Sequence, residues 1–186
     1  MQLEQLKQEF LIINESIYFD EHQYLREQTN NATRVQLFIE QAERLLQNTE
    51  SDEEQYYLLG TLGHCYRILN QANKAIYYLE QCLKKVEANP QRKMITLIRL
   101  GEAYKYNNQH NEALQLFEDA QAIQRAHKIE NYEDFIYQHK AKCFMELGDN
   151  AQAKEFLKSA LTIRKDKGVE SLITSTERAL QLLEEG

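Results

Sequence analysis

The sequence predicts an all-α protein, a right-handed α-solenoid of antiparallel helix hairpins that ends in a C-terminal capping helix. Two observations lead to this fold class. The 186 residues include one proline and six glycines, and the sequence is rich in Gln, Glu, Leu, Ala and Lys, which are good helix formers. A block of small and aromatic residues also recurs, with 38 residues from Gly63 to Gly101 and 40 from Gly101 to Ala141. A period of this length is typical of a stack of similar structural units.

Each copy of the block has a small residue, an aromatic residue three positions later, and an alanine at the same place in the helix that follows. Glycine or alanine lets the two helices of a hairpin approach closely, and the aromatic residue fills the space beside that contact. Because a solenoid buries its core between neighbouring units, each hairpin alone should be only marginally stable. The three copies are Leu62, Gly63, Tyr66, Ala75, Leu79 and Cys82; Leu100, Gly101, Tyr104, Ala113, Phe117 and Ala120; and Lys140, Ala141, Phe144, Ala153, Leu157 and Ala160.

The first 50 residues are predicted to form a degenerate helical hairpin that precedes the clear repeats. Apolar residues at helical spacing predict one long helix over 2–29 and a second helix over 33–47. Ala42 lies 40 residues before Cys82, which is one period of the repeat. The pair of helices over 1–50 is therefore expected to be a first, diverged unit.

Three units follow, over 52–89, 92–130 and 131–168. Ser51, with Glu54 three residues later, predicts a capping box at the start of the first of them. Asn70 and Gly148 fall in predicted turns, and both residue types tolerate the left-handed conformation that ends many helices. Residues 169–184 predict a last helix with one apolar and one polar face, as expected of a terminal cap that meets water. Because no linker is evident, we expect 1–186 to be one domain.

The net charge and the cysteines limit the classes of partner. A net charge of −7 argues against nucleic acid, since phosphate binding needs a basic face. The N-terminal residues lack the pattern of a signal peptide, and no apolar run is long enough to cross a membrane. Cys65, Cys82 and Cys143 are an odd number without CxxC spacing, which argues against a disulfide framework or a zinc site. We therefore expect a cytoplasmic protein with reduced thiols and no membrane partner.

No catalytic constellation is visible in the sequence. Gly60 and Gly63 are not followed by the Lys and Ser or Thr of a phosphate loop, and they lie within a predicted helix. His64 and Cys65 are adjacent on a helix and so point in different directions. The sequence therefore predicts a protein that is not an enzyme and that needs no cofactor or metal.

The repeated block resembles the tetratricopeptide repeat, with Leu-Gly, an aromatic residue three positions on, then Ala, then Leu or an aromatic residue, and a final Ala. The resemblance covers about residues 55–168. The units here are 38 to 40 residues long, against about 34 in the standard repeat, which implies helices about one turn longer. Such longer units resemble the repeats of bacterial peptide-responsive regulators and of kinesin light chains. The resemblance implies a concave surface lined by the first helix of each hairpin.

The residues that this resemblance places on the concave surface include more basic than acidic side chains, although the protein as a whole is acidic. Charge sorting of this kind favours a protein or peptide partner that is acidic or ends in a carboxylate. An ordinary solvated face is the alternative, in which Glu102 pairs with Arg99 three residues before it. Gly60 and His64 stand where some family members have the first Lys and Asn of a clamp for a peptide carboxylate, so that clamp is not expected. The predicted binding residues are Tyr57, His64, Arg67, Arg99, Glu102, Lys105, Tyr106, Phe135, Gln138 and Lys142.

The resulting function is a scaffold that binds a protein or peptide in its concave groove, with side chains such as Tyr57 and Phe135 as anchors. Two alternatives stay open. The chain could be a self-assembling structural module that forms a homo-oligomer through its ends or its N-terminal helix. It could also be an intracellular receptor for a signalling peptide without a DNA-binding domain of its own.

Overall fold

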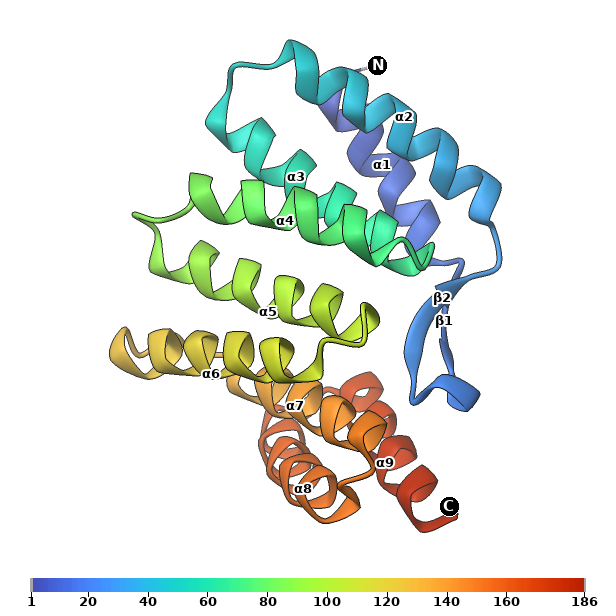
Figure 1. Ribbon diagram of the computed structural model, residues 1–186, viewed down its shortest axis with the longest axis vertical. Helices are drawn as coiled ribbons and strands as arrows, with labels where there is room; N and C mark the ends of the chain where they lie inside the picture. The colour runs from blue at the N-terminus through green and yellow to red at the C-terminus, as the bar shows by residue number, and fades with distance from the viewer. Residues whose placement is uncertain (1, 186) are drawn as a thin grey trace.

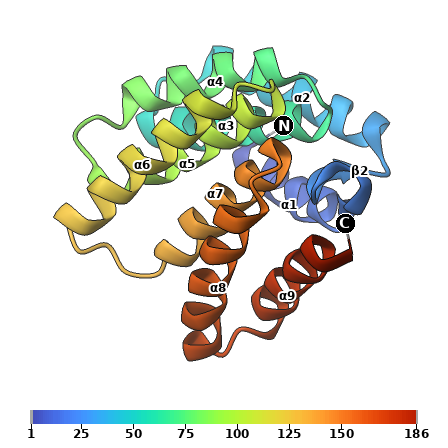
Figure 2. The ribbon, with the colours of Figure 1, turned by 60° about the horizontal axis from the view of Figure 1, so that its bottom comes forward.

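A computed structural model describes residues 2–185 and confirms the predicted fold class: helices arranged as a solenoid of antiparallel pairs (Figure 1). The stack runs from α1 and α2 at one end through α3, α4, α5 and α6 to α7, α8 and α9 at the other, as Figures 1 and 2 show. None of the described helices is both long enough and apolar enough to cross a membrane. The elements are α1 (Leu3–Asn14), β1 (Ile17–Asp20), the short 3₁₀ helix η1 (Glu21–Gln23), β2 (Arg26–Thr29), α2 (Ala32–Asn48), α3 (Asp52–Ile68), α4 (Ala72–Lys85), α5 (Pro90–Tyr106), α6 (His110–Ala126), α7 (Glu133–Leu147), α8 (Asn150–Lys167) and α9 (Glu170–Glu185).

The predicted long helix over 2–29 is wrong, because α1 ends at Asn14 and a β-hairpin follows it. β1 and β2 pair antiparallel, with Ile17 opposite Thr29. The Ser16 hydroxyl hydrogen-bonds the carbonyl of Ile13 at 2.7 Å and lies 2.9 Å from the hydroxyl of Thr29, so one side chain ends the helix and joins the base of the hairpin. The run Ile-Tyr-Phe in β1 consists of residue types that favour strands.

The small residues of the repeat do allow the close approach that the sequence predicts. A Cβ atom on Gly63 would lie 2.4 Å from Leu79 Cγ, and one on Gly101 would lie 2.5 Å from Phe117 Cε1. Both partners come from the second helix of the same hairpin. In the third unit Ala141 is fully buried, in the same cluster as the second-helix residues of its own hairpin. The structure therefore confirms the packing interpretation of these positions.

Most left-handed residues in the turns between helices are asparagine or glycine, which tolerate that conformation; Lys128, with φ of 49°, is an exception. Asn70 and Asn108 have φ of 57° and 58°, and Gly148 and Gly168 have φ of 76° and 67°. At the start of α3 the Ser51 hydroxyl accepts a hydrogen bond from the backbone N–H of Glu54, as predicted. The carboxylate of Glu54 turns instead to the hydroxyl of Thr49, so only half of the capping box forms.

Candidate functional site on the concave face

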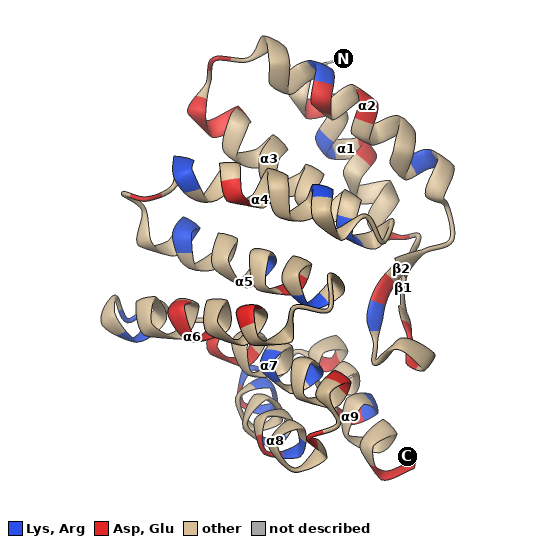
Figure 3. Ribbon diagram, in the orientation of Figure 1, with Lys and Arg blue, Asp and Glu red and all other residues tan. Residues whose placement is uncertain are grey.

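The first helices of the three clear pairs, α3, α5 and α7, share one face of the molecule, and the β1–β2 hairpin lies against that face. The hairpin leaves the α1–α2 end and extends toward α7 and α9 (Figures 1 and 2). At its tip Glu21 pairs with Arg178 of α9 through two bonds of 2.6 Å. Figure 3 shows a basic and an acidic segment next to each other on β2. The hairpin thus bridges from the first unit to the last helix.

Arg26 of β2 binds Glu146 of α7. Its Nε donates to Glu146 Oε1 at 2.9 Å and its Nη2 to Oε2 at 2.5 Å, a two-point contact of the kind that holds a carboxylate firmly. The same guanidinium donates to the backbone carbonyl of Lys105 at 3.0 Å. His110 lies 2.8 Å from Glu146 on the other side. Burial alone would raise the pKa of Glu146, but the bond to Arg26 and the charge of Lys105 hold that pKa below its ordinary value.

The half-buried carboxylate of Glu27 in β2 forms an ion pair with the buried Arg67 of α3. Arg67, only 4% exposed, also lies 3.5 Å from Glu102 of α5 and sits over the ring of Tyr106, 4.9 Å from its centre. The backbone N–H of Glu27 donates a hydrogen bond of 2.5 Å to the hydroxyl oxygen of Tyr106. Although burial opposes it, the charge of Arg67 keeps the pKa of Glu27 well below its ordinary value. The groove therefore holds both the side chain and the main chain of Glu27.

The two histidines on this face are neutral near neutral pH. Burial lowers the pKa of His64 to about 4, and the charge of Arg67 lowers it further than burial alone. Burial likewise lowers the pKa of His139 to about 4, against the pull of Glu102, which lies 3.3 Å away. Burial also lowers the pKa of Lys142 to about 8, and the ammonium of Lys142 donates to the backbone carbonyl of Leu25 in the hairpin at 3.1 Å. Most of the positive charge that the sequence predicts for this face is therefore paired with other groups of the same chain.

Most of the ten predicted binding residues are covered in this structure. Arg67, Lys105, Tyr106 and Lys142 contact the hairpin through the bonds described above. Three more are covered by the ends of the solenoid: Tyr57 lies under Lys7 of α1 with the ammonium 5.6 Å from the ring centre, His64 packs edge-on against Phe10 of α1 at 5.6 Å, and Gln138 accepts a hydrogen bond of 3.2 Å from Thr176 of α9.

Arg99, Glu102 and Phe135 are the three predicted residues that line an open cavity of about 320 Å³ on the same face. No ion pair joins Arg99 to Glu102 among residues 2–185, so the alternative in which these two pair on the helix surface does not hold there. Glu102 faces Arg67 and His139 instead. The exposed guanidinium of Arg99 makes no hydrogen bond or ion pair with any of the residues 2–185 that the structure describes. The other lining residues are Tyr56, Ile95, Ile98, Tyr132 and His139.

Sequence reasoning missed Tyr56 and Tyr132 in this cavity and the whole contribution of Arg26 and Glu27. On α3 the missed residue is the neighbour of the predicted Tyr57, and one position turns a side chain by about 100° around a helix. The repeat register had placed Tyr57 inward, whereas Tyr57 faces α1. No local pattern marks Arg26 or Glu27, because their partners lie 40 or more residues away in the sequence.

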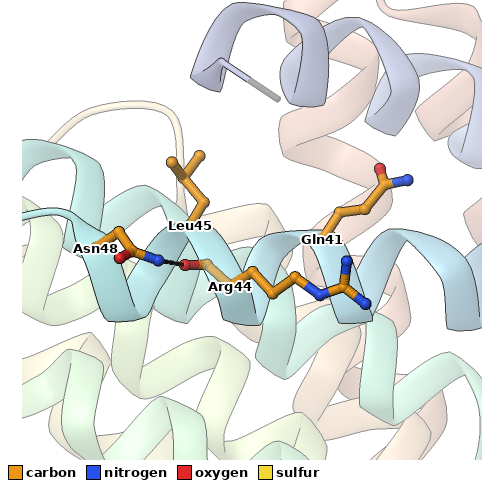
Figure 4. A pocket seen from close by; sticks show the side chains of 4 residues that line it. All are labelled: Gln41, Arg44, Leu45 and Asn48. Atoms are coloured by element: carbon orange, nitrogen blue, oxygen red, sulfur yellow. Dashed lines mark hydrogen bonds between the residues drawn. The ribbon is translucent and has the colours of Figure 1, made fainter.

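A larger hollow, of about 460 Å³, lies outside the concave face on α2, lined by Gln41, Arg44, Leu45 and Asn48 (Figure 4). Its side chains project from one helix, and Asn48 Nδ2 donates to the backbone carbonyl of Arg44. It brings no acid or base together with a nucleophile. Across residues 2–185 no three His, Cys, Asp or Glu side chains are grouped so that they could hold a metal ion. The cavity around Arg99 is therefore the better candidate for a binding site.

Comparison with solved structures shows which folds this chain is similar to. The apo form of RapI matches at a TM-score of 0.68 and 18% identity, over 84% of this chain and 58% of that chain. Bacillus thuringiensis PlcR, in complex with the peptide PapR7 and DNA, matches at 0.68 and 18%, over 78% and 54%. The nearly identical TPR-like repeats of a kinesin light chain from Podosopora anserina match at 0.64 and 18%, over 97% and 86%. The chain thus spans little more than half of the RapI and PlcR chains, and at these identities the likeness is one of fold.

Sequence comparison identifies the repeats directly. Residues 54–126 and residues 136–167 each match a family model described as tetratricopeptide repeat, and together the two matches cover more than half of the chain. No curated protein sequence matches the chain significantly. The matched ranges contain the three copies of the block of small and aromatic residues. The chain belongs to the tetratricopeptide repeat family.

Proposed function

We propose that this protein is a non-catalytic binding module that holds a protein or peptide partner in the open cavity between α3, α5 and α7. The single observation that carries the proposal is the state of Arg99. Its side chain is exposed at a cavity walled by aromatic and aliphatic groups, and it forms no ion pair within residues 2–185. Arg67, Lys105 and Lys142 on the same face are all engaged with other groups of the chain.

The lining of the cavity suits a partner that offers an apolar or aromatic side chain next to a carboxylate. Ile95, Ile98 and Phe135 supply apolar surface, and the planar guanidinium of Arg99 can bind both oxygens of a carboxylate. A volume of about 320 Å³ is at the small end for a ligand pocket. It fits one or two side chains of a longer partner that lies across the face.

The comparisons support a peptide or protein ligand as the class. The PlcR structure contains the peptide PapR7, and a Rap protein with a TM-score of 0.70 was solved in complex with competence and sporulation factor. Those ligands belong to those proteins, and this chain spans 42% of that Rap chain. A receptor for a signalling peptide is thus one form of the proposal. We further infer that the protein acts in the cytoplasm, since Cys65, Cys82 and Cys143 are all free and buried.

A random peptide library displayed on phage provides the test. Peptides selected on the wild-type chain are synthesised with a fluorophore and titrated against Arg99→Glu by fluorescence polarisation. Arg44→Glu is the matched control, because Arg44 is an exposed arginine on the outer face of α2. We expect at least a tenfold loss of affinity for Arg99→Glu and less than a twofold change for Arg44→Glu. Selected peptides that bind both variants like the wild type would show that the cavity is not the site.

Self-association is a second candidate, supported by apolar side chains at the N-terminal end of the solenoid. Leu11 and Leu37 are 58% and 54% exposed, and Ile12 next to Leu11 is also exposed. Burying these side chains against a second copy would remove them from water. Light scattering across a dilution series tests this directly, and a monomer at every concentration would rule it out.

A further inference from the structure

We propose that the part of the concave face beneath the β1–β2 hairpin is a second binding surface, and that its partner is an extended protein segment in which a basic residue precedes an acidic one. Such a segment would take the places of Arg26 and Glu27 and displace the hairpin. The proposal uses a different part of the concave face from the Arg99 cavity. The two sites adjoin at Glu102, which lines the Arg99 cavity and lies 3.5 Å from Arg67 beneath the hairpin.

Two charged side chains of the hairpin, Arg26 and Glu27, form ion pairs with the concave face, and the main chain beside them is bound as well. Leu25 also packs in a buried cluster with Ala141 and Met145, and Lys142 lies over the ring of Phe19, 4.5 Å from its centre. Glu146 accepts two hydrogen bonds from the guanidinium of Arg26, and Arg67 forms an ion pair with the carboxylate of Glu27. The main chain is bound at two points: Lys142 donates a hydrogen bond to the carbonyl of Leu25, and the hydroxyl oxygen of Tyr106 accepts one from the N–H of Glu27. Any extended chain offers these backbone groups, so the two charged side chains carry the selectivity.

The hairpin is held with little apolar burial. Leu25, at 5% exposure, is the one buried apolar side chain among residues 17–29, whereas Tyr18 and Phe19 in β1 are 48% and 46% exposed. At its tip Tyr24 and Leu25 have φ of 52° and 61°, a left-handed conformation that is unfavourable for residues other than glycine. A segment that makes the same polar contacts without this turn would avoid that strain.

The groove also has binding capacity that the hairpin does not use. Arg67 Nη1 is buried and makes no hydrogen bond to any residue that the structure describes; its nearest carboxylate, Glu102, is 3.5 Å away. The whole cluster, hairpin included, has four basic residues, Arg26, Arg67, Lys105 and Lys142, and three carboxylates, Glu27, Glu102 and Glu146. A partner with one more acceptor or carboxylate than the hairpin would pair with Arg67 and balance the cluster.

The test uses the full chain and a synthetic peptide of residues 16–30 labelled with fluorescein. In the wild type the tethered hairpin competes at a high effective concentration, so the peptide should bind weakly. In the double variant Arg26→Ala/Glu27→Ala the groove residues are intact and the competitor is weakened, so the peptide should bind at least tenfold more tightly. A second peptide with Arg26 and Glu27 exchanged in order is the matched control and should lose that gain. Glu27→Gln alone, which changes no side-chain volume, provides a milder variant and should give a smaller gain in the same direction.

Hydrogen exchange gives an independent readout on the same proteins. The amides of residues 17–29 should exchange faster in Arg26→Ala/Glu27→Ala than in the wild type, while those of α3 and α5 keep their protection. Arg99→Glu should leave the affinity for the peptide unchanged, because Arg99 lies in the other cavity; this separates failure of this proposal from failure of the proposed function.

Three results would overturn the proposal. The first is equal binding of the two peptides, and the second is no gain of affinity in either variant. The third is a wild-type dimer in light scattering that is lost in Arg26→Ala/Glu27→Ala, which would mean that the hairpin exchanges between copies of the chain instead.

Discussion

Replacing Gly63 by alanine should destabilise the protein, although alanine is the better helix former. A Cβ at this position would lie 2.4 Å from Leu79 Cγ and 2.8 Å from Leu79 Cδ2. Cγ is the branch point of a buried side chain, so relief requires that the leucine change rotamer or that α3 and α4 move apart. Neither response is easy in a close-packed interior.

The expected magnitude follows from two opposing contributions. Alanine is favoured over glycine in a helix interior by about 1 kcal/mol. Inserting a methyl group into a filled core costs about 1–3 kcal/mol, and contact with a branch carbon places Gly63→Ala at the upper end of that range. We therefore expect the free energy of unfolding to fall by about 1–2 kcal/mol.

The sign should reverse when the obstructing side chain is removed. Leu79→Ala alone should cost about 2–5 kcal/mol, because it leaves a cavity beside Gly63. In that background Gly63→Ala fills space and gains helix propensity, and it should stabilise the protein by about 0.5–1 kcal/mol. The two substitutions should thus be coupled by about 1.5–3 kcal/mol.

Urea unfolding followed by circular dichroism measures all four proteins of this cycle. Gly60→Ala is the matched control on the same helix, because its Cβ would meet only Arg99 Nη1, at 2.7 Å, the mobile end of an exposed side chain. That variant should gain up to about 1 kcal/mol. If Gly63→Ala also stabilises the wild type, or if its effect is the same with and without Leu79, the close-approach explanation of the repeat is refuted.

Three further predictions concern buried polar groups. Because burial lowers the pKa of His64 and His139 to about 4, the unfolded chain binds more protons than the folded chain below pH 6.5. The free energy of unfolding should therefore fall between pH 6.5 and 5 by at most about 2 kcal/mol per histidine, and by about 3 kcal/mol per histidine once the pH is below 4. Urea midpoints that stay constant from pH 6.5 to 5, or that fall equally in His64→Gln/His139→Gln, would contradict this prediction. Burial raises the pKa of Cys143 to about 12, so a thiol reagent at pH 8 should modify no cysteine of the folded protein and all three in urea, and fast modification of the native protein would show that the core is open. Asp134 is buried between Arg164, at 2.9 Å, and Lys167. Asp134→Ala should therefore lower the free energy of unfolding by about 3–5 kcal/mol, measured in thermal or urea unfolding. A loss below about 1 kcal/mol would mean that water reaches Arg164.

The repeat could be predicted from the sequence because its packing is local. Gly63 and Leu79 belong to one hairpin and lie 16 residues apart, so their types and spacing recur together in each unit. Residues 17–29 lacked such a pattern. Ile17 continues the helical spacing of Phe10 and Ile13, and the helix prediction followed that spacing past the point where α1 ends.

The accessibility of the predicted binding residues also depends on contacts between residues far apart in the sequence. Of the predicted residues, Arg99, Glu102 and Phe135 line an open cavity on the face of α3, α5 and α7. Which of the others stay accessible depends on a hairpin whose contacts span 40 to 120 residues of sequence. Periodicity within one repeat contains no information about contacts of that length.

A charged helix face in a repeat protein indicates that a complement exists, and the complement can lie in the same chain. Arg67 on the predicted concave face favoured an acidic partner, and the structure supplies one in Glu27. The positive charge of Arg67 is therefore paired within the chain, and an acidic partner stays a prediction. The structure separates the two cations on which the two proposals rest. Arg67 is paired with Glu27 of the hairpin, whereas Arg99 is unpaired among the described residues and lines an open cavity. A loss of affinity for the selected peptides in Arg99→Glu would consequently report one binding event on this face. A gain of affinity for the peptide of residues 16–30 in Arg26→Ala/Glu27→Ala would report a different one.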